Sequence, residues 1–163
     1  TTGQVSAVSM PGRKQAERAE QAIERLGIAS LHDRGFHQIS GGERQLTMIA
    51  RALAQNARVL ILDEPTANLD FGNQIKVLTQ IRSLAEEGYT VVQATHNPDQ
   101  TFLFSDRVLA LKDGRVLADG TPADIVSSEL MQTLYGVEIE VQRLYDDAVR
   151  VCIPKAAIQR SER

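Results

Sequence analysis

Residues 39–70 read ISGGERQLTMIARALAQNARVLILDEPTANLD, and this stretch decides the fold of the 163-residue chain. It contains a glycine turn that opens a helix, an apolar strand that ends in two carboxylates, and a short acidic loop. Together these features indicate phosphate and magnesium chemistry. The other residues are interpreted as the scaffold around them.

The glycine turn is Ser40-Gly41-Gly42-Glu43, which fits a capping box in which the serine hydroxyl and the glutamate carboxylate satisfy free amides at a helix start. Two glycines are unfavourable there, because each costs roughly 1 kcal/mol relative to alanine inside a helix. Without side chains, however, Gly41 and Gly42 leave amides open at the positive end of the helix dipole. The turn therefore predicts close approach of a phosphate.

The apolar strand is Val59-Leu60-Ile61-Leu62, as expected for a central parallel strand covered on both faces. Asp63 and Glu64 follow at its carboxyl end, where open α/β sheets place their ligands. Adjacent carboxylates repel each other at the edge of a core, which favours a functional reason for the pair. We expect Asp63 to hold magnesium through water, and Glu64 to orient or deprotonate an attacking water.

Two further residues are candidates for the same site. Asp70 lies in the loop of residues 68–70, where helix capping and a subunit contact are both open interpretations. A helix at residues 75–88 and a strand at residues 89–95 imply a right-handed parallel crossover, so His96 should reach the same sheet edge as the carboxylates. His96 either caps the helix near Pro98 or senses a γ-phosphate.

Outside these segments the sequence pattern predicts secondary structure and no functional residues. An amphipathic helix is predicted at residues 13–26, after a poorly ordered lead-in at residues 1–11. Asp113-Gly114 predicts a hairpin, and Thr121 starts a helix that is followed by another at residues 129–135. Alternation at residues 137–141 and 148–153 predicts an antiparallel pair around Asp146-Asp147, and residues 155–163 are predicted to be a frayed tail.

Composition excludes several classes. The formal net charge is -3 and the basic residues are dispersed, which argues against nucleic acid as a partner. Cys152 is the single cysteine, so no internal disulfide can form and a reducing compartment is expected. No apolar run approaches the ~20 residues that span a bilayer, so any membrane association should go through a protein partner.

At these motifs, in order, the chain resembles the ATP-binding subunits of ABC transporters. Residues 40–43 are similar to the family's signature turn, with glutamate where many members have glutamine. The resemblance assigns Asp63 and Glu64 to the Walker B strand as magnesium ligand and catalytic glutamate, Asp70 to the D-loop, and His96 to the switch histidine. Two longer strings, SGGERQLTMIARALAQ and LDEPTANLDFGNQ, are most similar to importer ATPases for iron chelates, haem, cobalamin and molybdate.

The resemblance implies an α/β fold, a P-loop NTPase core of the ABC type. The Walker A pattern, G-x-x-x-x-G-K-[ST], does not occur in these residues, and Gly12-Arg13-Lys14 lacks its upstream glycine. The first residue, Thr1, also suggests a truncated or processed product. We therefore expect an incomplete core, the family's C-terminal portion, with a helical subdomain and signature helix at 1–56, the C-terminal half of the sheet at 57–120, and C-terminal helices with a small β hairpin at 121–163.

The implied function is ATP hydrolysis that drives an importer. In the family two such subunits form a dimer that sandwiches ATP and magnesium, beneath transmembrane permeases and indirectly a substrate-binding protein. The expected location is cytoplasmic, on the inner face of the membrane. A non-catalytic truncated fragment and a DNA-repair ATPase are the alternatives, although the latter class inserts coiled coils and no heptad run is present. The isolated chain is expected to be inactive and to expose a sheet edge prone to association.

Overall fold

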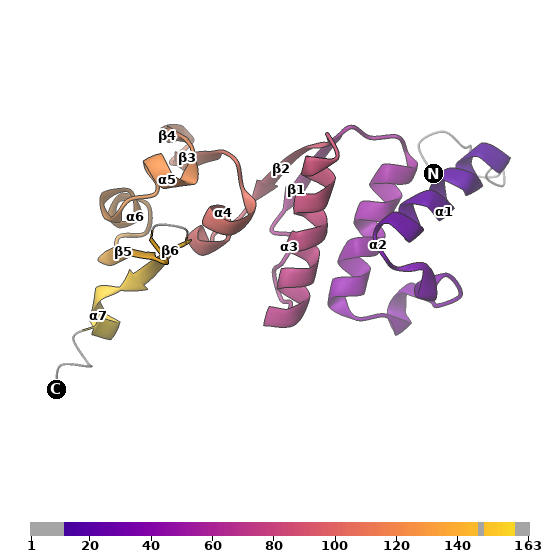
Figure 1. Ribbon diagram of the computed structural model, residues 1–163, viewed down its shortest axis with the longest axis horizontal. Helices are drawn as coiled ribbons and strands as arrows, with labels where there is room; N and C mark the ends of the chain where they lie inside the picture. The colour runs from indigo at the N-terminus through magenta and orange to yellow at the C-terminus, as the bar shows by residue number, and fades with distance from the viewer. Residues whose placement is uncertain (1–11, 147–148, 159–163) are drawn as a thin grey trace. The chain divides into compact units, whose positions relative to one another are not determined.

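The computed structural model describes residues 12–146 and 149–158, which form two compact units, 12–95 and 96–158 (Figure 1). The first unit contains helices α1 (Arg13–Arg25), α2 (Gly41–Ala54) and α3 (Phe71–Glu86), with the short 3-10 turns η2 (Ala29–Leu31) and η3 (Phe36–Gln38) between α1 and α2. Its strands are β1 (Val59–Asp63) and β2 (Thr90–Ala94). The expected lead-in at residues 1–11 lies outside the described residues.

The local signals of the sequence act as predicted in this unit. Gly27 has a φ of 67° just after α1, and Gly88 has a φ of 91° after α3, which is the left-handed conformation that ends a helix at little cost for glycine. β1 and β2 pair in parallel with Val59 opposite Thr90 and Asp63 opposite Ala94. The predicted parallel pairing of the two strands that α3 connects is thereby confirmed, and the right-handedness of the crossover stays a prediction.

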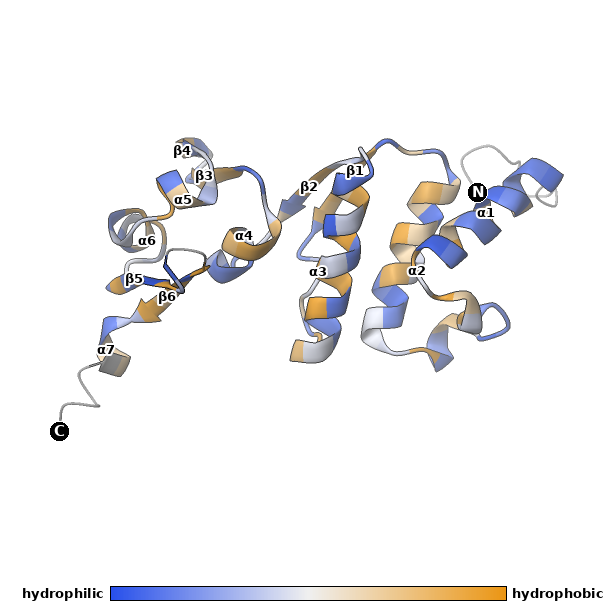
Figure 2. Ribbon diagram, in the orientation of Figure 1, coloured by the Kyte–Doolittle hydropathy of each residue, from blue (hydrophilic) through white to orange (hydrophobic). Residues whose placement is uncertain are grey.

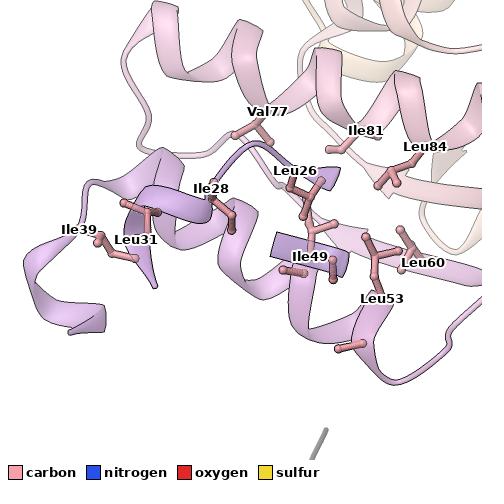
Figure 3. Close-up of a cluster of buried hydrophobic side chains, with 13 residues drawn as sticks. Leu26, Ile28, Leu31, Ile39, Ile49, Leu53, Leu60, Val77, Ile81 and Leu84 are labelled. Carbon is pink, nitrogen blue, oxygen red and sulfur yellow. The ribbon is translucent and has the colours of Figure 1, made fainter. Parts of the chain in front are cut away.

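The core of the first unit lies between the three helices and one face of the strand pair. Ile49 and Leu53 of α2 point toward Ile81 and Leu84 of α3, with Leu60 of β1 beside them (Figure 3). These side chains are at most 9% exposed. Because burial of a Leu or Ile side chain is worth roughly 1.5–3 kcal/mol, this cluster fixes α2 and α3 against β1 and so positions the loops at their starts.

The opposite face of the strand pair is uncovered in the described part of the chain. Ile61 of β1 is 80% exposed and its partner Val92 of β2 is 54% exposed. In Figure 2 the apolar part of β2 is coloured orange. The prediction of a strand covered on both faces is thus wrong for these residues, because the helices that pack on β1 cover only its Leu60 side.

The second unit contains α4 (Pro98–Phe104), the antiparallel pair β3 (Val108–Lys112) and β4 (Arg115–Gly120), and helices α5 (Pro122–Ile125) and α6 (Ser128–Tyr135). A second antiparallel pair, β5 (Ile139–Leu144) and β6 (Val149–Pro154), precedes α7 (Lys155–Ile158).

Both predicted hairpins of the second unit form. Asp113 and Gly114 have φ values of 50° and 73°, as a tight hairpin turn requires. The second turn includes Tyr145 and Asp146, with φ values of 52° and 55°, whereas Asp147 lies outside the described residues. The prediction of a frayed tail at residues 155–163 is wrong at its start, because residues 155–158 form α7. The Lys155 amide anchors this helix by donating to the Glu138 carbonyl at 3.0 Å.

Candidate functional site

The glycine turn forms the predicted capping box at the start of α2. The Ser40 amide donates to Glu43 Oε2 at 2.7 Å, and the Glu43 amide donates to Ser40 Oγ at 3.3 Å. The hydrogen bond from the Ser40 amide is the main cause that lowers the pKa of Glu43 below its ordinary value. Glu43 therefore stays ionised at neutral pH and holds the turn in one conformation.

The two glycines of this turn lie close to α3 and to the loop that precedes it. A Cβ on Gly42, which is buried, would lie 3.0 Å from the Cβ, Cγ and Oδ1 atoms of Asn73. A Cβ on Gly41 would lie 2.9 Å from Leu69 Cδ2. Close approach of a neighbouring helix thus explains the bareness of Gly42 without any ligand. A phosphate contact at these amides stays a prediction.

Asp70 is the N-cap of α3. Its Oδ1 accepts from the Asn73 amide at 2.9 Å, and its Oδ2 accepts from Asn73 Nδ2 at 2.6 Å. These bonds lower the pKa of Asp70. Gln74 Nε2 donates to the Leu69 carbonyl at 2.9 Å, which fixes the loop from its other side. The capping interpretation of Asp70 is confirmed, and a subunit contact remains open.

Asn73 is a residue of this site that the sequence interpretation missed. An N-cap aspartate at position 70 predicts the hydrogen bond from the Asn73 amide, three residues later, but not the second bond from the Asn73 side chain. Its contact with Gly42, 31 positions earlier in the chain, has no local sequence signal.

Asp63 and Glu64 lie at the carboxyl end of β1, as predicted, and both are exposed. The Glu64 amide donates to the Ala94 carbonyl at 3.0 Å, which extends the β1–β2 ladder by one residue. Glu64 has a φ of 41°, in the left-handed region that a glutamate rarely occupies. Such backbone costs roughly 1–3 kcal/mol and clusters at functional sites. Asp113 and Asp146 also have positive φ values, but both lie in hairpin turns. The position of Glu64 at the end of a parallel strand, together with its backbone conformation, makes it the candidate reactive carboxylate.

The carboxylates at the end of β1 fit a magnesium ion. A hollow of about 350 Å³ is lined by β1, including Asp63, and by α2 residues such as Gln45 and Met48. Among the described residues no group of three or more His, Cys, Asp or Glu side chains is gathered to bind a metal ion. One or two carboxylates, completed by water and phosphate oxygens, are the usual protein share of a magnesium site.

His96 begins the second unit, and its side chain is exposed. Its backbone carbonyl accepts a hydrogen bond from the Tyr135 hydroxyl at 3.1 Å. The cap of α4 is Asn97, whose Oδ1 accepts from the Asp99 amide at 3.0 Å. The interpretation of His96 as a helix cap is thus wrong, and the role as phosphate sensor stays a prediction.

Cys152 is half-buried in β6. Burial, with Asp99 nearby, raises the pKa of its thiol to about 12. Because the thiolate is the nucleophilic form, Cys152 is not a candidate nucleophile at neutral pH.

Comparison with known families and proteins gives consistent matches. The family model described as "ABC transporter" matches residues 2–67. An uncharacterized ABC transporter ATP-binding protein of Haemophilus influenzae is 39% identical over 131 residues, which is 80% of this chain and 50% of that protein. The hemin import ATP-binding protein HmuV of Agrobacterium fabrum is 36% identical over 160 residues, covering 93% of this chain and 62% of the relative.

Further relatives extend the comparison. The ferric enterobactin transport ATP-binding protein FepC of Escherichia coli is 38% identical over 77% of this chain and 47% of its own length. A solved metal-chelate type ABC transporter in an inward-facing conformation superposes with a TM-score of 0.85 at 31% identity, over 96% of this chain and 64% of that chain. The chain spans about half the length of the curated relatives it matches. In the described part of the chain, no helix has the length and apolar character needed to cross a bilayer.

Proposed function

We propose that this chain, which belongs to the ATP-binding subunits of the ABC transporter family, serves in the ATP-hydrolysing energy-coupling subunit of an importer. The observation that carries the proposal is the pair Asp63 and Glu64 at the end of a parallel strand, with Glu64 held at a φ of 41°. The relatives named for hemin and ferric enterobactin favour haem or siderophore iron as the solute. Cobalamin and molybdate stay predictions from the sequence strings.

The proposed division of labour follows from the chemistry of the side chains. Asp63 holds the magnesium ion, which neutralises phosphate charge when bound. Glu64 accepts the proton of the attacking water, a task that an exposed carboxylate can perform at the end of a strand. The imidazole of His96 contacts the γ-phosphate.

We assign the signature turn of one subunit to the ATP that a second copy of the subunit holds. Gly41 and Gly42 lie at the start of α2, and Asp70 lies at the start of α3. The two helix starts are close to each other in the same unit. We place these two loops against the ATP of a partner subunit in a homodimer. The dimer works beneath transmembrane permease subunits, and so on the inner face of the membrane, and is coupled indirectly to a substrate-binding protein.

The isolated chain is proposed to be inactive. Its 163 residues contain no G-x-x-x-x-G-K-[ST] pattern, so they offer no lysine-bearing loop for the β- and γ-phosphates. A non-catalytic role for the isolated chain is the alternative. Measurable magnesium-dependent ATP hydrolysis by the purified chain would contradict the proposed inactivity.

The test of the function replaces Glu64 with Gln in the protein expressed from its complete reading frame. ATP hydrolysis should fall by roughly 10²- to 10⁴-fold, the usual contribution of a general base, while ATP binding is retained. Glu24→Gln is the matched control, because Glu24 is an exposed glutamate on α1. It should leave both properties unchanged.

A further inference from the structure

The last residue of α6 contacts the backbone of His96. Tyr135 ends this helix, and its hydroxyl donates to the His96 carbonyl at 3.1 Å across 39 positions of sequence. Gly136 follows in the left-handed conformation, with a φ of 72°, and ends α6 at that point. Partial burial raises the pKa of Tyr135, so the hydroxyl remains a proton donor at neutral pH.

The helix that carries Tyr135 is fixed to two strands. Ser128 Oγ, in the first turn of α6, accepts from the Val141 amide of β5 at 3.2 Å. Near its other end, Lys112 Nζ of β3 donates to the Thr133 carbonyl. Tyr135 is therefore presented by a helix that is held at both ends.

The chain on the other side of His96 is also anchored. Asn97 caps α4, which sets the backbone immediately after His96. Asp99 Oδ1 accepts from the Cys152 amide of β6 at 2.8 Å. The segment from His96 to Asp99 is thus tied both to α6 and to the β5–β6 pair.

We propose that Tyr135 is a positioning residue for His96, and that α6 with the β5–β6 pair exists in this unit to hold the backbone of the histidine that meets the γ-phosphate. The proposal rests on the proposed function for the role of His96. It assigns a task to α6, β5 and β6, which the ATP-binding motifs do not use. The hydroxyl acts through the carbonyl of His96 and touches no phosphate itself.

The first readout is spectroscopic and uses the 163-residue chain. Tyr135→Phe removes the hydroxyl and keeps the ring. We expect the carbonyl and imidazole resonances of His96 to shift in the NMR spectra, while those of His32 and His37 stay in place. Tyr145→Phe is the matched control, because Tyr145 is 82% exposed at the β5–β6 turn, and it should leave all three histidines unchanged. Unmoved His96 resonances in Tyr135→Phe, or equal shifts in Tyr145→Phe, overturn the proposal.

The second readout is kinetic and uses the protein from its complete reading frame. Loss of one hydrogen bond that positions His96 should lower kcat by roughly 2- to 10-fold and leave the KM for ATP unchanged. A purely structural role would lower thermal stability without this kcat change, and that result overturns the proposal even if the resonances move. Wild-type turnover in Glu64→Gln would instead refute the proposed function, so the two failures are distinguishable.

Discussion

Replacing Gly42 with Ala tests whether the glycine turn, Ser40-Gly41-Gly42-Glu43, is built around its contact with α3. Gly42 is buried in the first turn of α2, and an added methyl group would lie 3.0 Å from three atoms of Asn73. Asn73 cannot move away freely, because its amide and its side chain both bond to Asp70, at 2.9 and 2.6 Å. The methyl group must therefore displace the start of α3 or break these bonds.

Two opposing effects set the expected change in stability. Alanine is better than glycine in a helix by at most about 1 kcal/mol, whereas overpacking costs roughly 1–3 kcal/mol. Because the cost of overpacking exceeds the gain in helix propensity, Gly42→Ala should destabilise the chain by about 1–2 kcal/mol. Gly72→Ala is the matched control, since Gly72 holds the same second helical position in α3 and a Cβ there would meet only Asp70 Oδ1, at 3.4 Å. It should be neutral or stabilise by up to about 1 kcal/mol.

Urea unfolding followed by circular dichroism measures both variants. A third variant, Gly42→Ala combined with Asn73→Gly, removes the atoms that the methyl group meets, so Gly42→Ala should cost less in that background. A Gly42→Ala chain as stable as the Gly72→Ala chain would refute the reasoning, because Asn73 would then not limit the space at Gly42.

Two other predictions concern acid and association. Hydrogen bonds from Asn73 lower the pKa of Asp70, so the stabilisation that they give is present above the unfolded pKa of about 4 and is lost as the pH falls through the lower, folded pKa. The difference in unfolding free energy between wild type and Asp70→Ala should therefore shrink below about pH 4. A difference that stays constant from pH 7 to pH 3 contradicts this prediction. Ile61 is 80% exposed on the uncovered face of β1, so Ile61→Lys should reduce concentration-dependent association of the isolated chain through this face in sedimentation velocity, while changing stability by less than about 0.5 kcal/mol. A wild-type chain that stays monomeric at all concentrations rules out association through this face.

The sequence predicts the structure correctly where the signal is local. The Ser40–Glu43 capping box, the left-handed Gly27 and the Asp113-Gly114 hairpin depend on residues within a few positions, and all three form as predicted. The strand, helix, strand order was equally sufficient for the parallel pairing of β1 with β2. The α/β fold class of an ABC ATPase portion is confirmed by the match to the solved transporter.

The features that the sequence did not reveal are contacts between distant positions. Asn73 lies against Gly42, and the Tyr135 hydroxyl reaches His96, but neither pair is linked by a spacing or a motif. Gly42 is instructive, because the sequence pattern predicts a phosphate contact there, whereas the side chain of Asn73 on a neighbouring helix explains the need for glycine within the chain. The choice of Asn97 rather than His96 as the cap of α4 shifts the helix start by one residue, and the sequence leaves that start open because either side chain could accept a hydrogen bond there.

The most direct measurement follows bound ATP and released phosphate in the same single-turnover experiment, with Glu64→Gln and Glu24→Gln proteins from the complete reading frame. The account predicts that Glu64→Gln binds ATP in the presence of magnesium and retains it unhydrolysed, while Glu24→Gln releases phosphate at the wild-type rate. Release of phosphate by Glu64→Gln at the wild-type rate would contradict the central claim that Glu64 activates the attacking water.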